Sequence, residues 1–442
     1  MATRFEPVGA LRGTLRPPPD KSISHRAALI AAMGEGETTI EGYLDAADTR
    51  STLAAIQTLG ASVSGGDPGT GAGQGAVKRE LRIRGVGMRG PQEAGIDVGN
   101  AGTLLRLLPG WLAGQETGAW TLDGDASIRR RPVDRIVEPL REMGAELSCR
   151  EGRLPPLEVS GSPLRGITYE MPIASAQVKS CLLFAGLLAE GETKVIEPLS
   201  SRDHSERMLA AAGAEIQRDG QAVAVQPVGR LEIDRIVVPA DFSSAAFFIV
   251  AALLVEGSDV GIDDVGLNPT RTGLIDVLKR MGAQIEVEPG GEEGGEPIGT
   301  LVARSSKLRG TEVGGAEVPL AIDELPLVAL AACFAEGTTT IRDAAELRRK
   351  ESDRIETVAT ALNALGGKVE TTADGMAIEG TGGLRGGSVN AAGDHRIAML
   401  GAVAGLASKE GVEVHGMDAA AVSYPGFEAD LAALLGGGTG TS

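Results

Sequence analysis

One short pattern returns about six times along this chain of 442 residues. An apolar residue suited to the end of a helix is followed by glycine, a small residue and a residue that favours strands. The six glycines are Gly60, Gly144, Gly213, Gly282, Gly366 and a degenerate last copy at Gly436, spaced by 84, 69, 69, 84 and 70 residues. Because glycine readily adopts the left-handed conformation that ends a helix, each copy predicts a helix turning directly into a strand.

A second pattern alternates with the first. An Ala/Leu-rich helix is followed by an acid-glycine pair and a strand rich in Thr, Val and Ile; the pairs are Glu35-Gly36, Glu190-Gly191, Glu256-Gly257, Glu336-Gly337 and Glu410-Gly411, with Gly114-Gln115 as the irregular member. Two helices with their strands in each of six copies predict a repeat architecture of α/β class. Six copies divide naturally into two sets of three, so we expect two cores, packed mainly with aliphatic residues because only 3% of the chain is aromatic.

Composition narrows the possible partners and location. Three cysteines without metal-ligand spacing predict neither a disulfide framework nor a zinc site, and they suit a reducing compartment. The first residues lack a signal-peptide core, and the longest apolar run, 245–255, is too short to span a bilayer and predicts a buried helix. A net charge of −18 argues against nucleic acid or an anionic membrane as partner. We therefore expect a cytoplasmic protein.

Glycine-rich stretches at 64–75, 289–299 and from 436 predict exposed loops and a frayed end.

Short polar clusters stand in front of the apolar helices. Five lie in the first half (20–26, 99–103, 127–132, 175–180 and 201–207), and three in the second half add carboxylates (322–326, 350–354 and 394–396). Serine and a cation at a helix start form a natural anion site. An ordinary capped helix with solvated charges explains the first cluster about equally well, and an ordinary turn or solvated face is the commoner explanation for the second and third. The set together nevertheless favours a ligand with more than one anionic group. In the cluster 350–354 we expect Lys350 and Arg354 to share one face of a helix.

Other chemistries find little support. The sequence has no nucleophile elbow, P-loop or dinucleotide fingerprint. The four histidines are isolated, so no metal site is expected, and no cofactor.

The clusters carry motifs that resemble the 5-enolpyruvylshikimate-3-phosphate synthase family of enolpyruvyl transferases. They are PDKSISHR, GNAGTLLRLL, GDAS, RRRP, SAQVKS, SRDHSERML, LNPTR, KESDR and GDHRIAM, in the family's order from Pro19 to about Pro425. The resemblance implies a two-domain inside-out α/β barrel in which each domain has three copies of a βαβαββ unit. It places the N-terminal domain at 21–240 and the C-terminal domain at 1–20 plus 241–442.

The resemblance also implies an activity. The family transfers the enolpyruvyl group of phosphoenolpyruvate to the 5-hydroxyl of shikimate-3-phosphate through a tetrahedral intermediate and releases phosphate. The resemblance implies that the protein is a monomer, uses these two small-molecule substrates and needs no cofactor. Two alternatives remain: the related transferase that acts on UDP-N-acetylglucosamine, which the Lys21-Ser22 pair disfavours, and a binding protein without catalysis.

Site residues follow from the matching motif positions. Contacts to shikimate-3-phosphate are implied for Lys21, Ser22, Arg26, Ser175, Gln177, Ser201, Arg202, Asp323 and Lys350, and contacts to phosphoenolpyruvate for Lys21, Gly102, Arg131, Arg354 and Arg396. The implied catalytic residues are Asp323 as base for the 5-hydroxyl, Glu351 at the methylene carbon and Lys21 as proton donor.

The chain departs from the family pattern at two places. Ser127 stands where some members have arginine, so the anion contact passes to Arg131, with Arg130 as the alternative. Val422 stands where others have lysine, so one phosphate contact is either missing or supplied elsewhere, with Lys179 and Arg106 as the candidates. Glycine rather than alanine at Gly102 favours sensitivity to glyphosate, which occupies the phosphoenolpyruvate site in this family, whereas SRDHSERML and the missing C-terminal lysine resemble the more tolerant members.

Overall fold

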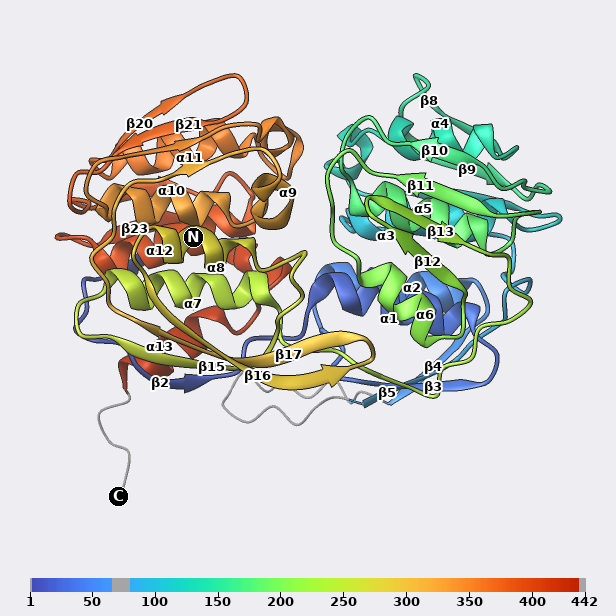
Figure 1. Ribbon diagram of the computed structural model, residues 1–442, viewed down its shortest axis with the longest axis horizontal. Helices are drawn as coiled ribbons and strands as arrows, with labels where there is room; N and C mark the ends of the chain where they lie inside the picture. The colour runs from blue at the N-terminus through green and yellow to red at the C-terminus, as the bar shows by residue number, and fades with distance from the viewer. Residues whose placement is uncertain (1, 66–79, 437–442) are drawn as a thin grey trace.

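The computed structural model describes residues 2–65 and 80–436, and its ribbon forms two lobes (Figure 1). The buried hydrophobic side chains fall into two clusters that share no residue. One cluster uses residues between Ile23 and Val238 and defines the N-lobe. The other uses Phe5, Leu11 and Leu15 together with residues between Phe242 and Leu434, and it defines the C-lobe. The loop expected at 64–75 and the end expected from 436 fall almost entirely outside the described residues.

The N-lobe contains the first six α-helices and most strands of the first half of the chain. Its helices are α1 (Lys21–Met33), α2 (Ala47–Thr58), α3 (Gly102–Ala113), α4 (Asp134–Glu142), α5 (Ala176–Gly186) and α6 (His204–Ala211), with the 3₁₀ turn η1 (Ile128–Arg130). Its strands are β3 (Glu37–Glu41), β4 (Ser62–Gly65), β5 (Glu80–Arg84), β6 (Ala94–Asp97), β7 (Ala119–Asp123), β8 (Glu146–Arg150), β9 (Leu154–Ser160), β10 (Thr168–Glu170), β11 (Thr193–Ile196), β12 (Ile216–Asp219), β13 (Ala222–Val225) and β14 (Arg235–Val237).

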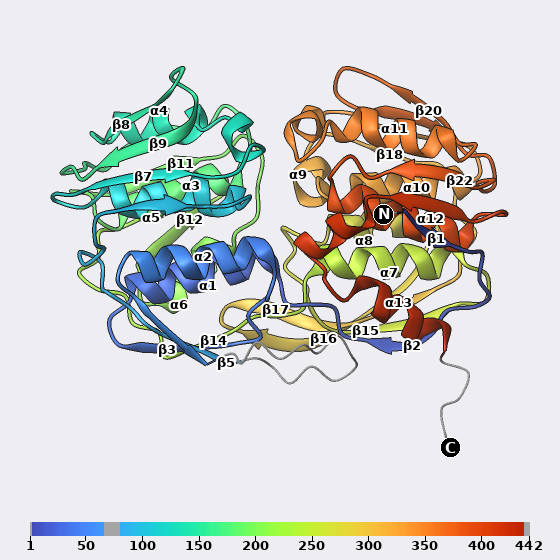
Figure 2. The same ribbon diagram turned by 180° about the vertical axis from the view of Figure 1, so that it is seen from behind.

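The C-lobe combines the second half of the chain with the first two strands (Figure 2). Its helices are α7 (Phe242–Leu254), α8 (Gly273–Arg280), α9 (Glu317–Ala321), α10 (Leu325–Phe334), α11 (Arg354–Ala364), α12 (His395–Ala407) and α13 (Phe427–Leu435), with η2 (Ala345–Arg349) and η3 (Met417–Val422). Its strands are β1 (Ala2–Phe5), β2 (Arg12–Leu15), β15 (Asp259–Gly266), β16 (Gln284–Glu293), β17 (Glu296–Arg304), β18 (Glu312–Val313), β19 (Thr338–Ile341), β20 (Lys368–Thr371), β21 (Met376–Glu379), β22 (Gly387–Asn390) and β23 (Val412–His415).

The sheets share one pattern of pairing. In the strand order β6-β7-β9-β8, β6 runs parallel to β7, and the next two pairs are antiparallel. The orders β14-β3-β5-β4, β10-β11-β13-β12, β2-β15-β17-β16 and β18-β19-β21-β20 follow the same rule, and β22-β23-β1 lacks the last strand. The repeated turn is confirmed at five of its six glycines, whose φ angles lie between 91° and 104°, whereas Gly436 has a φ of −84°. The α/β class predicted from the sequence is therefore confirmed.

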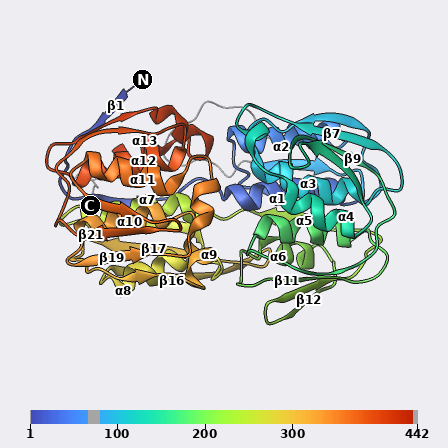
Figure 3. The same ribbon diagram turned by 90° about the horizontal axis from the view of Figure 1, so that it is seen from above.

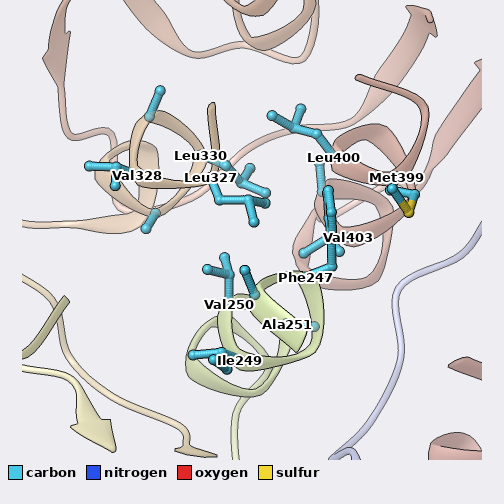
Figure 4. Close-up of a cluster of buried hydrophobic side chains, with 14 of the residues drawn as sticks. Phe247, Ile249, Val250, Ala251, Leu327, Val328, Leu330, Met399, Leu400 and Val403 are labelled. Atoms are coloured by element: carbon cyan, nitrogen blue, oxygen red, sulfur yellow. The ribbon is translucent and has the colours of Figure 1, made fainter. Parts of the chain in front are cut away.

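Three helices in each lobe are buried along nearly their whole length: α1, α3 and α5 in the N-lobe and α7, α10 and α12 in the C-lobe (Figure 3). In the C-lobe, Val250 of α7, Leu327 of α10 and Leu400 of α12 face a shared interior (Figure 4). Most of these side chains are aliphatic, so the core is closed by many small contacts rather than by stacked rings. The buried helix expected at 245–255 is α7.

The chain passes between the lobes twice, side by side. Pro19 and Ala240 form an antiparallel bridge. Asp20 N donates to Pro239 O at 2.8 Å, and Asp241 N donates to Pro18 O at 2.8 Å. The two connections thus hold each other in register directly beside the starts of α1 and α7.

Local predictions failed in three places. The expected loop at 289–299 is part of the paired strands β16 and β17, because its backbone groups find ladder partners despite the glycines. Helix α1 begins at Lys21, so the cluster 21–26 lies inside the helix, with Asp20 as its cap. Lys350 precedes α11, which begins at Arg354, so these two residues do not share a helix face.

Among the described residues, no helix is long and apolar enough to cross a membrane.

Helices α3 and α5 approach most closely at Gly110, where an added methyl group would lie 2.1 Å from the carbonyl oxygen of Cys181. We expect Gly110→Ala to lower the free energy of unfolding by about 1–3 kcal/mol, because backbone cannot yield as a side chain can. Urea unfolding measures the change. Gly95→Ala is the control, since nothing lies within 4 Å of its added methyl; equal stability of both variants would contradict the close approach.

Candidate functional site

The buried helices of both lobes begin at one cavity of about 490 Å³. Its wall includes Lys21 of α1, Gly102 of α3, Ala176 of α5, Ser243 of α7 and His395 of α12, together with Asp323 just before α10. Unpaired backbone N–H groups and the positive end of each helix dipole therefore point toward one space. Such a convergence favours ligands that carry several negative charges.

The cavity reverses the charge balance of the chain. Its wall holds eleven lysines and arginines against six aspartates and glutamates, whereas the whole chain has a net charge of −18. An acidic protein with a locally cationic cavity concentrates its positive field where a small anion would bind.

Every site residue predicted from the sequence lines this cavity. They are Lys21, Ser22, Arg26, Gly102, Arg131, Ser175, Gln177, Ser201, Arg202, Asp323, Lys350, Glu351, Arg354 and Arg396. They come from helix starts and loops of both lobes, so neither lobe alone assembles the site.

On the N-lobe side, Arg26 is held rigidly. Its Nε donates to Ser205 Oγ at 2.7 Å, its Nη2 to Ser180 Oγ at 3.0 Å and its Nη1 to the backbone oxygen of Ser22 at 2.9 Å. Burial lowers the pKa of Arg26 to about 10, so the guanidinium remains charged at neutral pH. A buried cation fixed by neutral oxygens keeps its charge available for an anion in the cavity.

Next to it, α3 and α5 are joined across the cavity wall. Arg106 Nη1 donates to Gln177 Oε1 at 3.3 Å, and Gln177 Nε2 donates to Thr103 Oγ1 at 3.2 Å. Arg131 Nη2 donates to Asn100 Oδ1 at 2.9 Å and to Ser127 Oγ at 3.4 Å. Ser127, the first departure from the family pattern, thus supports Arg131, the arginine for which the sequence predicts the anion contact.

On the C-lobe side, Arg354 lies among three carboxylates and is 1% exposed. Its Nε donates to Asp394 Oδ2 at 2.8 Å, its Nη2 to Glu351 Oε2 at 2.6 Å and its Nη1 to Asp323 Oδ1 at 3.1 Å. Asp394 caps α12, so the guanidinium is fixed relative to that helix.

Asp323 is bound by cations from both lobes. Besides Arg354, it pairs with Arg202 of the N-lobe, and Lys350 Nζ lies 3.2 Å from its Oδ1. Burial alone would raise the pKa of Asp323, but Lys350, Arg202 and the neighbouring arginines hold it well below its usual value. The carboxylate is therefore ionised at neutral pH.

Glu351 is ionised for a similar reason. Burial opposes the charge, but Arg354, His395, Arg131 and Lys21 keep the pKa of Glu351 well below its usual value. Its Oε1 lies 3.7 Å from Arg131 Nη1, across the space between the lobes. Both candidate catalytic carboxylates are thus proton acceptors in this arrangement rather than donors.

Arg396 rests on a buried network that sequence reasoning did not identify. Its Nη2 donates to Ser243 Oγ at 2.8 Å, and its Nη1 lies 3.4 Å from Glu324 Oε1. Ser243 is also bonded to Glu324 and to Arg271, and the Nη1 of Arg271 lies 3.2 Å from both Glu324 oxygens. Arg271 belongs to the quoted LNPTR motif, and that motif was the only sequence signal for it.

The candidate cations left open by the sequence differ in whether they line the cavity. Arg130 is exposed and away from the cavity wall, whereas Arg131 lines it. Lys179 is 1% exposed and bound to Glu197 at 2.7 Å and Glu206 at 2.8 Å, so the expectation that it faces the ligand is wrong. Arg106 does line the cavity.

Asp48 is a further residue that sequence reasoning missed. It lies in the first turn of α2, and its Oδ2 accepts a hydrogen bond from Lys21 Nζ at 3.1 Å. Its segment was not recognised as a polar cluster, although Arg50 and Ser51 follow in the same helix. Among the described residues, no group of three or more His, Cys, Asp or Glu side chains could hold a metal ion.

The fold and the cavity define a two-lobed α/β protein that holds small anions between its lobes. The model of the family described as EPSP synthase (3-phosphoshikimate 1-carboxyvinyltransferase) matches residues 5–431. A protein named 3-phosphoshikimate 1-carboxyvinyltransferase from Methylococcus capsulatus is 48% identical over 97% of this chain and 96% of its own, and one from Synechococcus sp. (strain JA-3-3Ab) is 50% identical over 98% and 96%. The chain belongs to the EPSP synthase family.

Two solved structures of enolpyruvyl transferases have the same fold as this chain. An EPSP synthase from Acinetobacter baumannii superposes with a TM-score of 0.84 at 43% identity, covering 96% of both chains. The enolpyruvyl transferase NikO from Streptomyces tendae has a TM-score of 0.76 at 18% identity, covering 98% of this chain and 96% of its own, and it shows the shared fold alone.

The burial of His25 beside the site leads to a prediction about how folding stability depends on pH. His25 of α1 is fully buried, and its Nδ1 lies 2.6 Å from Thr52 Oγ1. Burial, with smaller contributions from Lys21 and Arg26, lowers its pKa to about 3. Below about pH 6.5 the unfolded chain binds a proton that the folded chain refuses, so stability falls by up to ~1.4 kcal/mol per pH unit from this residue.

We therefore expect His25→Asn to lose less stability than the unaltered protein between pH 7 and pH 5, as measured by urea unfolding at each pH. His415→Asn is the control, because that side chain is half exposed. Parallel pH profiles for His25→Asn and the unaltered protein would refute the assignment.

Proposed function

We propose that this protein transfers the enolpyruvyl group of phosphoenolpyruvate to the 5-hydroxyl of shikimate-3-phosphate and releases inorganic phosphate. The observation that carries the proposal is the cavity itself, where an excess of cations from both lobes surrounds two ionised carboxylates. Each substrate carries one phosphate and one carboxylate, so both need cations and helix N-termini. Membership of the EPSP synthase family supports the same reaction.

The two substrates divide the cavity between them. We assign shikimate-3-phosphate mainly to the N-lobe wall and phosphoenolpyruvate to the arginines between the lobes. The first group comprises Lys21, Ser22, Arg26, Ser175, Gln177, Ser201 and Arg202, with Asp323 and Lys350 from the C-lobe; the second comprises Lys21, Gly102, Arg131, Arg354 and Arg396. Arg106 supplies a further cation beside Gly102, with its Nη1 3.3 Å from the Gly102 backbone oxygen.

In the addition step, the 5-hydroxyl oxygen bonds to C2 of phosphoenolpyruvate while its proton passes to Asp323. The Lys21 ammonium, oriented by Asp48, supplies the proton that C3 gains. Arg202 now holds Asp323; when a substrate anion takes over that arginine, the carboxylate loses a partner and becomes a stronger base.

In the elimination step, C3 loses a proton and the bond between C2 and the phosphate oxygen breaks. Glu351 is the acceptor for that proton, because its low pKa keeps it ionised before the step. The cations that surround the tetrahedral intermediate stabilise its charge without reorganising, which is commonly the larger part of catalysis.

Several finer predictions remain proposals. We propose that the N-lobe corresponds to a domain at 21–240 and the C-lobe to 1–20 plus 241–442, and that each is a three-unit βαβαββ half of an inside-out α/β barrel. The common sheet pattern and the paired connections at Pro19 and Ala240 support this division. A monomer, a cytoplasmic location and, through Gly102, sensitivity to glyphosate stay predictions.

A phosphate-release assay with each acceptor tests the reaction. We expect release from phosphoenolpyruvate when shikimate-3-phosphate is present, and none with UDP-N-acetylglucosamine or without an acceptor. Turnover with the uridine nucleotide alone would instead assign the related transferase, and no turnover with either acceptor would favour a binding protein.

Asp323→Ala tests the proposed base. We expect the variant to fold and to lose about 10²–10⁴ in kcat, the usual contribution of a positioned base. Asp323→Asn, which keeps the shape but cannot accept the proton, should be equally impaired. Asp343→Asn is the control on the same cavity wall, because its amide can still accept from Gly315 N. Near-normal turnover in the Asp323 variants would remove Asp323 from this role.

A further inference from the structure

One ion pair across the cavity involves no residue assigned to a substrate or to the chemistry. Arg135 lies in the first turn of α4, and Glu346 lies in η2. Arg135 Nη1 donates to Glu346 Oε2 at 3.0 Å, and Nη2 donates to Oε1 at 2.7 Å. This two-pronged geometry is the strongest form of an arginine–carboxylate contact.

The two partners belong to different lobes. Val133 and Ile136, on either side of Arg135, pack into the core of the N-lobe. Leu347, next to Glu346, packs into the core of the C-lobe. Because each partner is anchored by its neighbours in a separate core, the pair can form only when the lobes are close together.

Its neighbours along the chain are site residues. Arg131 lies four residues before Arg135, and Lys350 lies four residues after Glu346. A contact that fixes the start of α4 against η2 therefore also sets the distance between an arginine assigned to phosphoenolpyruvate and a lysine assigned to shikimate-3-phosphate.

The other charged contacts across the cavity differ in one respect. Arg202 pairs with Asp323, and Arg131 lies 3.7 Å from Glu351. The proposed function assigns all four of these residues to substrates or to proton transfer, so bound anions compete for the same arginines. Arg135 and Glu346 also line the cavity, but the proposed function assigns neither of them to a substrate, so on that assignment no bound anion competes for the pair.

We propose that Arg135 and Glu346 form a clasp that holds the two lobes closed and positions Arg131 and Lys350 without contacting either substrate. Both side chains are about one-third exposed, at 30% and 33%, so water still reaches the pair. Arg135 also lowers the pKa of Glu346 against the effect of its partial burial, which keeps the carboxylate charged at neutral pH.

The clasp has a distinctive kinetic consequence, which rests on the proposed function. If substrates bind productively only to the closed form, the apparent affinity of each is reduced by the fraction of molecules that are closed. Loss of the clasp should therefore raise KM for both substrates by the same factor and leave kcat nearly unchanged. A side chain that touched one substrate would shift one KM alone.

Charge reversal tests this directly. We expect R135E and E346R each to raise both KM values about five-fold, near the upper end of what a partly exposed ion pair provides. The double variant R135E/E346R restores the pair with its charges exchanged and should return both KM values to within about two-fold of the starting protein.

The matched control is the Arg280–Glu317 pair, which is also two-pronged, with distances of 2.6 and 2.9 Å. It joins α8 and α9 inside the C-lobe, and its side chains are 41% and 39% exposed. R280E and E317R should leave both KM values unchanged. If a reversed variant of the clasp fails to fold, as judged by its thermal unfolding, R135Q and E346Q replace it.

Small-angle X-ray scattering of the substrate-free protein provides a readout independent of activity. We expect a larger radius of gyration in the single variants and recovery in the double variant. A shift in one KM only, no change in either KM, or a double variant as impaired as the worse single variant would overturn the clasp. Failure of the unaltered protein to use shikimate-3-phosphate would count against the proposed function alone, because the scattering comparison would still decide the clasp.

Discussion

Six buried helices point their N-termini at a single cavity, and the rest of the structure accommodates that arrangement. Helix ends of like sign repel one another and leave N–H groups without partners, so the convergence is unfavourable unless negative groups occupy it. Acidic caps supply part of the compensation: Asp20 accepts from Ile23 N, Asp241 from Ser243 N and Asp394 from Arg396 N, all at 2.8–2.9 Å. Each of these bonds satisfies one N–H group of a helix start, and Asp394 and Asp241 also pair with Arg354 and Arg271 of the cavity wall.

The two carboxylates proposed to be catalytic fill the same electrostatic role. Asp323 and Glu351 lie against arginines that would otherwise face like charges across a buried space. An incoming phosphate or carboxylate must displace these partners, so binding exchanges one set of ion pairs for another. The free energy gained is smaller than the contact list suggests, because removing charges from water and from existing partners opposes it. Under the proposed mechanism the exchange also couples binding to chemistry, since it frees the proposed base, Asp323, when the substrate arrives.

The lobes meet in two different ways. On the side of the chain connections, the tip of the β16–β17 hairpin reaches α6, where His204 Nδ1 lies 2.7 Å from Glu296 Oε1 and both side chains are 2% exposed. Asn268 Nδ2 donates to Asp203 Oδ1 at 2.6 Å beside it. Breaking these contacts would leave buried polar groups unpaired, which is costly, whereas water can replace the partners of a one-third exposed ion pair. Relative motion of the lobes should therefore begin at Arg135 and Glu346 and pivot about α6.

The sequence predicted what depends on local geometry and on motif order. Glycine at a helix end needs only its own backbone freedom, so the turns at Gly60 and its counterparts could be recognised in advance, and motif order identified all fourteen predicted cavity residues. The ion-pair partners that a side chain finds only in the folded structure could not be predicted from the sequence. Lys179 stands in a motif of site residues, yet two buried glutamates hold it away from the cavity. The glycines at 289–299 suggested a loop, whereas the segment folds back on itself as a hairpin, with Pro289 paired to Gly299 and Glu293 to Glu296. Glu346 carries no motif signal of its own, since its role exists only when a second lobe brings Arg135 within reach.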